Sequence, residues 1–170
     1  MGFGKSFGFS LLTYIGMNFL FIIIAYTVSN DLNTLFSDIT ANPFIILLVL
    51  CGPIINFPGT VILGIYNGIM GPLVPDLLIQ LVGYFVSPFI AAIVAGRVGD
   101  KNGASFGGWI LTCILCALAI GLLVYFSPTT LTNYGLVATN ETLVIALFGG
   151  ITNGIFYGAF ALLFTKTEYY

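Results

Sequence analysis

The ten charged residues of this chain lie between or beside long apolar runs, and none lies inside one. They are Lys5, Asp31, Asp38, Asp76, Arg97, Asp100, Lys101, Glu141, Lys166 and Glu168. A charge at the centre of a bilayer costs about 3 kcal/mol even on the scale derived from insertion experiments, so this exclusion is what lipid requires. With 59% hydrophobic and only 6% charged residues, the chain also lacks the polar surface to coat a water-soluble globule. We expect an all-α polytopic integral membrane protein, with residues 1–170 forming a single transmembrane domain.

Four apolar runs are long enough to cross a hydrocarbon core of about 30 Å, which takes about 20 helical residues. They cover approximately 9–28, 77–96, 104–126 and 142–165. A fifth apolar region, 43–71, is interrupted by Gly52-Pro53 and again by the segment 56–59, and proline breaks a helix. Each half of this region has about 13 residues, or about 20 Å of helix, which is too short to cross alone. The sequence therefore predicts four transmembrane helices plus a broken, re-entrant helical hairpin at 43–71, or a fifth, kinked span there.

The basic residues favour the re-entrant hairpin. If the region 43–71 returns to the face from which it came, Lys5, Arg97, Lys101 and Lys166 share one face of the membrane. The other face then carries the acidic residues Asp31, Asp38, Asp76 and Glu141. Because Lys and Arg are enriched in cytoplasmic segments, this arrangement predicts that the N- and C-termini are both cytoplasmic. By the same reasoning, Trp109 is expected in an aromatic belt at the membrane interface.

Two local matches suggest an internal repeat. Ser6-Phe7-Gly8 recurs as Ser105-Phe106-Gly107, and the segment 64–70 (GIYNGIM) recurs as 150–156 (GITNGIF) in the same order. The possible repeat units are 5–71 and 104–158. Such repeats are common in transporters, where the binding site lies at the repeat interface and includes broken helices. A duplicated packing unit without a transport role is the alternative. A genuine repeat would also make the first apolar run a permanent helix and not a cleaved signal peptide.

Small residues recur every four positions in the second pair of matching segments. Gly64 and Gly68 lie in the first segment and Gly150 and Gly154 in the second, and Gly158 continues the same spacing just beyond it. Residues four apart share one helix face, and small ones allow another helix backbone to approach closely in lipid. These glycines are therefore predicted to pack helix against helix. The pattern does not distinguish a partner within the chain from a second subunit.

Asn67 and Asn153 occupy equivalent positions beside these glycines. A buried amide needs a hydrogen-bond partner, so the two side chains are expected to bond each other, bond nearby carbonyls or contact a polar solute. Asn18, Asn56 and Gln80 are further candidates for buried amides.

The loop between the second and third predicted spans carries charge within a glycine-rich turn. Gly96-Arg97-Val98-Gly99-Asp100-Lys101-Asn102-Gly103 resembles the Gly-x-x-x-Asp-Arg/Lys-x-Gly signature of the cytoplasmic loop of major facilitator transporters. The resemblance ends at Ala104-Ser105, where that family has basic residues. A tight turn with cytoplasmic positive charges explains the same residues. Arg97, Asp100 and Lys101 are therefore predicted to form a cytoplasmic loop.

Composition excludes several kinds of site. The chain has no histidine, so it lacks the commonest metal ligand. Cys113 and Cys116 lie in the middle of an apolar run, where packing is the expected role of a cysteine. No catalytic, cofactor-binding or metal-binding residue and no cofactor is predicted, and with no basic patch a nucleic-acid partner is not expected.

This pattern bears on three possible functions. We expect a non-catalytic structural or accessory subunit of a membrane assembly, packed through glycine-rich helix faces. Its partners would be the lipid bilayer and either other membrane subunits or further copies of itself. The alternative is a small homo-oligomeric channel or transporter for a small neutral solute. The third function, an intramembrane enzyme, would need catalytic groups that the sequence does not provide.

Overall fold

The structure, a computed structural model, describes residues 2–133 and 136–166, and it confirms the all-α fold. Within these residues, four helices are long and apolar enough to cross a membrane, or five spans if the bent pair described below counts as one: α1 (Gly2–Val28), α5 (Pro75–Val98), α6 (Asn102–Phe126) and α8 (Asn140–Leu163). The shorter elements are α2 (Leu32–Ala41), α3 (Ile45–Cys51), the 3-10 turn η1 (Gly52–Ile55), α4 (Pro58–Met70) and α7 (Pro128–Asn133). The ends of the long helices lie within two residues of the predicted runs, except that α1 begins at Gly2, seven residues earlier than predicted.

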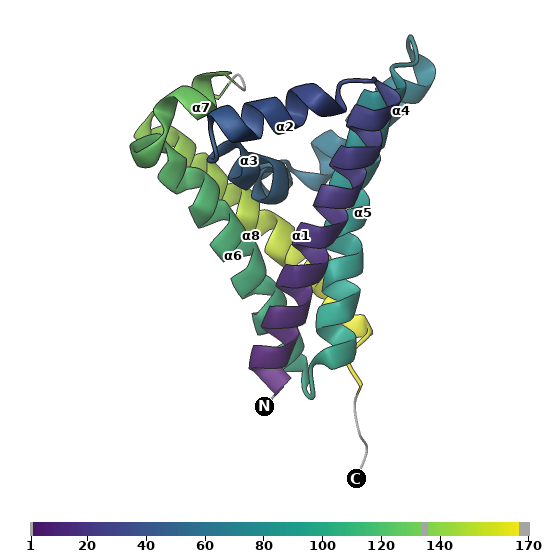
Figure 1. Cartoon of the computed structure of the whole chain (residues 1–170). Coiled ribbons are helices and arrows are strands. Elements are labelled where there is room, and N and C mark those ends of the chain that lie inside the picture. Colours follow the sequence, from purple (N-terminus) through teal and green to yellow (C-terminus); the bar gives the residue numbers. More distant parts are fainter. Residues whose placement is uncertain (1, 134–135, 167–170) are drawn as a thin grey trace.

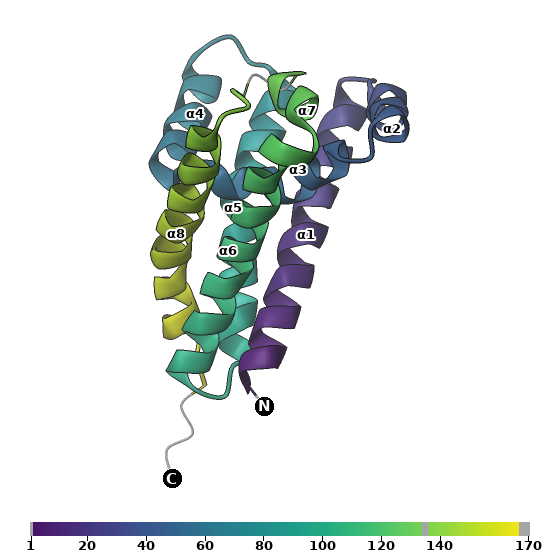
Figure 2. The same cartoon turned by 90° about the vertical axis from the view of Figure 1, so that its left-hand side faces the viewer.

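The long helices form two arms that meet at one end of the molecule and separate at the other (Figure 1). One arm pairs α1 with α5, and the other pairs α6 with α8. We call the end where the arms meet the terminal end, because Gly2 and the last turn of α8 lie there. We call the opposite end the hairpin end, because α2 and the α4–α5 loop lie there (Figure 2).

The broken region fills the space between the separated arms. The chain descends through α3 and η1 toward the middle of the bundle, and α4 then leads back to the hairpin end (Figure 1). The axes of the segments Ile45–Ile55 and Pro58–Met70 are bent by 98°. Proline sets both breaks, since Pro53 lies at the start of η1 and Pro58 is the first residue of α4. The region 43–71 therefore has the shape of a re-entrant hairpin.

Small residues join the two arms at the terminal end. A methyl group on Gly96 of α5 would clash with the Ala161 carbonyl oxygen of α8. Within the first arm, the Ser6 hydroxyl of α1 donates to the Ala95 carbonyl of α5 at 3.0 Å. One turn further along α1, the hydroxyls of Ser10 and Thr112 are 2.8 Å apart. The three helix interfaces are thus tight, and their hydroxyls are paired.

Trp109 corrects one expectation. Its side chain is fully buried between Tyr14 and Tyr157, whose rings meet it edge-on at centroid distances of 6.2 and 6.4 Å. It is therefore a core residue of the bundle and not part of an interfacial belt, because α6 turns this side of its first turns toward α1 and α8.

The two segment pairs behind the predicted repeat differ in relative direction. The helices that carry the first match, α1 and α6, run the same way, whereas α4 and α8, which carry the second, run in opposite directions (Figure 1). The repeat therefore stays a prediction. A single rotation about the long axis of the bundle could superpose α1 on α6, but the same rotation would not superpose α4 on α8.

Candidate functional site

Two asparagines hold the re-entrant hairpin at its innermost point. The Asn153 side chain of α8 donates to the carbonyls of Ile54 and Asn56 at 2.7 and 2.9 Å. From the opposite arm, the Asn18 side chain of α1 donates to the Leu50 carbonyl at 2.8 Å. Both amides are almost fully buried. The hairpin turn is therefore attached to both arms through its own backbone.

These bonds satisfy a requirement that the membrane imposes. A chain that leaves helical geometry in a bilayer frees carbonyl groups, and each unpaired group there costs several kcal/mol. The η1 turn frees such carbonyls at the point where it changes direction. Gly149 allows α8 to reach them, because a methyl group at this position would lie 2.6 Å from the Ile55 carbonyl oxygen. Asn153 and Gly149, one helical turn apart, thus form a single docking face for the hairpin.

A cavity of about 310 Å³ lies between this turn and the arm formed by α1 and α5. Its lining comes from α1, α5, the hairpin and the segment between α7 and α8: Ile22, Tyr26, Leu48, Val49, Gly52, Pro53, Ile55, Asn56, Gln80, Tyr84 and Leu136. Four of these are polar, and none is charged. The volume is at the lower end of the range for small-molecule sites. The cavity is therefore mostly apolar, with a few uncharged hydrogen-bonding groups.

The polar lining offers both donors and acceptors. The Asn56 and Gln80 amides each carry a carbonyl oxygen and an NH2 group, and the hydroxyls of Tyr26 and Tyr84 can donate or accept. Pro88 has no N–H, so the carbonyl of Tyr84, four residues earlier in α5, lacks its usual helical donor. Such a set can bind an uncharged, hydrogen-bonding molecule.

The predicted packing glycines of α8 lie against α6 of the same chain. Added methyl groups would lie 2.6 Å from the Ala117 Cβ at Gly150 and 2.7 Å from the Ile110 Cδ1 at Gly154, and at Gly158 one would clash with the Phe106 ring. The contacts in α4 are looser. Added methyl groups at Gly64 and Gly68 would lie 3.2 and 3.4 Å from the side chains of Leu81 and Leu78 of α5.

The structure does not bring Asn67 and Asn153 together. Asn153 is directed at the hairpin backbone, which is the carbonyl-bonding alternative, whereas Asn67 is exposed on α4. Asn18, Asn56 and Gln80, the other amides that the sequence singled out, all lie at the hairpin turn or in the cavity beside it.

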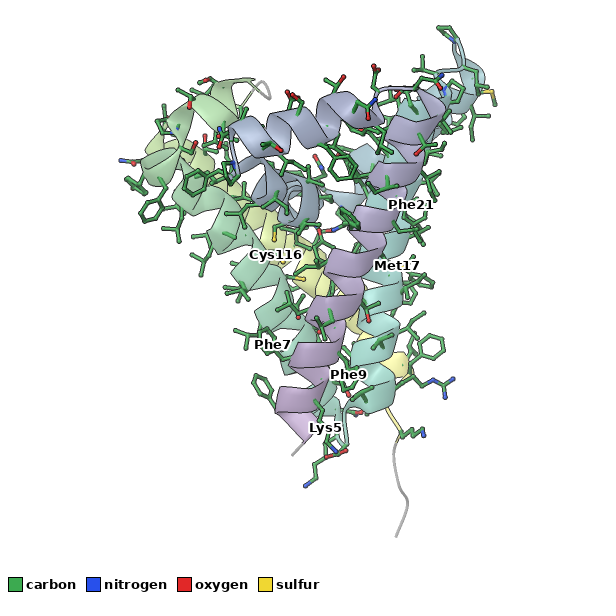
Figure 3. All side chains as sticks on the ribbon, in the orientation of Figure 1. Lys5, Phe7, Phe9, Met17, Phe21 and Cys116 are labelled. Atoms are coloured by element: carbon green, nitrogen blue, oxygen red, sulfur yellow. The ribbon has the colours of Figure 1, made fainter. Side chains whose placement is uncertain are left out.

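The charged loop lies at the terminal end, away from the cavity. Arg97 is in the last turn of α5, and its guanidinium lies over the Phe164 ring, 5.5 Å from the centroid. Lys101 is the N-cap residue of α6, and Asp100 lies beside Gly2. Lys5 is at the same end (Figure 3). Lys166 lines a depression with Arg97 and Asp100, and Glu168 is outside the described residues.

Sequence reasoning missed Tyr26 and Tyr84 as cavity residues and also missed a polar stripe on α1. Ser6, Ser10, Tyr14 and Asn18 recur every four residues and are at most 1% exposed. This spacing was a readable signal, because a lipid-facing helix has no use for a continuous polar face.

Comparisons with known proteins identify no relative. No protein-family model, no curated protein and no solved structure matches the chain. Among the described residues, no three His, Cys, Asp or Glu side chains are close enough together to hold a metal ion.

Proposed function

We propose that the protein binds a small uncharged solute in the cavity beside the re-entrant hairpin and passes it across the membrane without catalysing a reaction. The observation that carries this proposal is the uncharged polar lining of that cavity, which reaches the hairpin turn. Intramembrane charges mark most ion-coupled and proton-coupled paths, and a neutral solute does not need them. The geometry thus favours the second of the two functions expected from the sequence.

The hairpin supplies the part that would move. The arms are sealed against each other at the terminal end, so a solute in the cavity can cross only if the turn at residues 52–56 shifts and the arms also separate at that end. Two hydrogen bonds from Asn153 attach this turn and one from Asn18 attaches Leu50 of α3 beside it, so few bonds would have to break for the turn to move. Broken helices near the membrane centre have this role in many transporters.

The basic residues suggest the orientation. Lys5, Arg97, Lys101 and Lys166 all lie toward the terminal end, so the positive-inside tendency would place that end, with both termini, in the cytoplasm. The cavity would then belong to the half of the protein on the external side.

The test is solute flux into liposomes that contain the purified protein, followed by light scattering with urea, glycerol and acetamide as probes. We expect flux above that of protein-free liposomes, and Gln80→Leu should reduce it to background because the cavity loses an amide. Asn67→Leu, a matched change outside the cavity, should leave flux unchanged. Equal flux of wild type and Gln80→Leu would contradict the proposal.

One observation favours the accessory-subunit function as a second candidate. Gly4, Gly8 and Gly16 share one face of α1, and added methyl groups there would meet no described atom within 4 Å. Glycine weakens a helix by about 0.5–1 kcal/mol relative to alanine, so three on one lipid-facing surface suit a helix from another subunit. Native mass spectrometry of protein extracted from its own membranes tests this. A partner in fixed ratio that is lost in Gly8→Leu would support the subunit function, and a monomer would exclude it.

A further inference from the structure

A depression at the terminal end brings together two basic side chains, one from the end of each arm. It is lined by Arg97 and Val98 of α5, by Gly99 and Asp100 of the following loop, and by Lys166, which lies three residues beyond α8. Its volume is about 310 Å³. Because α5 and α8 belong to different arms, a ligand that contacts both cations also connects the arms.

The depression lies at the level of the membrane surface. Helices α5 and α8 each have 24 residues, whereas a hydrocarbon core requires about 20, so their ends reach the headgroup region. Arg97 is the penultimate residue of α5, and the exposed Leu162 and Leu163 end α8 shortly before Lys166. Charged groups at the helix ends, with apolar side chains one turn deeper, match the layers of a phospholipid, whose phosphate lies above its acyl chains.

The Arg97 guanidinium has a defined neighbour and remains able to donate hydrogen bonds. Its central carbon lies over the ring of Phe164, the C-cap residue of α8, 5.5 Å from the centroid, which is a cation–π contact between the two arms. A ring face attracts the positive charge and uses none of the five N–H groups as a conventional donor. Two of these groups can therefore bind phosphate oxygens as a pair, and Lys166 adds a second charge on a flexible stem.

The charges of the lining favour an anion. Arg97 and Lys166 provide two positive charges, and Asp100 provides one negative charge. The Asp100 carboxylate is directed toward the start of α1, since a methyl group on Gly2 would lie 2.7 Å from its Oδ2 atom. Gly2 does not line the depression, so this carboxylate lies toward its α1 side. The lining as a whole is therefore positive.

We infer that this depression binds the phosphate group of an anionic phospholipid, whose acyl chains lie along the exposed leucines of α8. Basic pockets between transmembrane helices are typical sites for such headgroups. A dissolved phosphate ion would contact the same cations but would make no use of the adjoining apolar surface. Bound lipid would connect α5 to the end of α8 close to the contact between Gly96 and Ala161, and so hold the arms together there. The inference does not depend on the proposed solute path.

Native mass spectrometry of the full-length protein, stripped of lipid in detergent, measures the binding directly. Phosphatidylglycerol, whose headgroup has a net negative charge, is titrated alongside phosphatidylcholine, in which choline compensates the same phosphate. We expect phosphatidylglycerol to bind more tightly. Lys166→Gln and Arg97→Gln should each weaken its binding about fivefold, the effect of one basic residue near an anionic headgroup. Lys166 lies outside the helices, so its variant keeps the test valid if Arg97→Gln does not fold.

Lys5→Gln is the matched control, because it removes one positive charge at the same end of the molecule from a residue that does not line the depression (Figure 3). Because salt screens exposed charges, its affinity for phosphatidylglycerol should stay within about twofold of the wild type. Equal losses in Lys5→Gln and Lys166→Gln would overturn the inference, since diffuse surface charge would explain both. Equal affinity for the two lipids would also overturn it. Displacement of phosphatidylglycerol by millimolar inorganic phosphate would do the same, because it would identify a site for the free anion.

Discussion

The two halves of the same four helices are closed by different means. At the terminal end, the arms meet through glycine, alanine and serine, and backbones touch directly, as at Gly96 and Ala161. At the hairpin end, the arms are apart, and a re-entrant segment held by Asn18 and Asn153 occupies the gap. In this protein, small residues therefore close the terminal half of the bundle. In the hairpin half, two amide side chains hold the non-helical backbone of the hairpin in place by hydrogen bonds. The cavity lies in the hairpin half, where amide hydrogen bonds to the hairpin take the place of close packing between the arms.

This contrast predicts that steric changes matter most in the terminal half. Gly96→Leu places a side chain against the Ala161 carbonyl, a backbone atom that cannot rotate away, so we expect the free energy of unfolding to fall by about 3 kcal/mol. Gly8→Leu, on the open face of α1, should change it by less than about 0.5 kcal/mol. Unfolding of both variants in detergent, followed by circular dichroism, provides the measurement. Equal losses would mean that close backbone contact does not seal this half.

In the hairpin half, removing an amide should release the turn while the bundle stays folded. Asn153→Leu leaves the carbonyls of Ile54 and Asn56 unpaired, and we expect a loss of about 2 kcal/mol in the free energy of unfolding. Cys51, now 7% exposed, should then react faster with a maleimide in a protein that lacks Cys113 and Cys116.

Asn67→Leu is the control for this release, because it makes the same change at an amide that is exposed on α4. In this variant, Cys51 should react with the maleimide at the same rate as in the protein with Asn67 unchanged. If Asn153→Leu also matches the wild type, the amide does not hold the hairpin.

The smallest effect is expected where α2 and α7 meet at the hairpin end. The Thr130 hydroxyl accepts a hydrogen bond from the Asn42 side chain at 2.6 Å and pairs with the Ser127 hydroxyl at the same distance. Thr130→Val removes both bonds, so the free energy of unfolding should fall by about 1 kcal/mol. The exposed neighbour provides the control, and Thr129→Val should leave unfolding in detergent unchanged.

Most of the architecture could be predicted from the sequence, because lipid restricts where charge and proline can lie. The four spans follow from apolar length, and the hairpin follows from the breaks at Pro53 and Pro58. The helices α2 and α7 were not predicted. Both are too short for a length criterion, and α2 buries only Leu35 fully, so little apolar periodicity was available.

The candidate site was only partly predictable. Amides stand out in apolar runs, and four of the five that the sequence singled out lie at the hairpin or its cavity. The pairing of Asn67 with Asn153 depended on a sequence match, and such a match says nothing about helix direction. Trp109 was misplaced because its position along α6 is near an end, whereas its burial depends on which face of that helix packs.

The central claim is that the region 43–71 enters the membrane and returns, so that the cavity opens on one side only. We would test it with single cysteines at Asp38, Asp76 and Lys101 in sealed vesicles, labelled with a membrane-impermeant maleimide before and after permeabilisation. The account predicts that positions 38 and 76 label from one face and position 101 from the other. Labelling of positions 38 and 76 from opposite faces would show that the region crosses the membrane and would contradict the account.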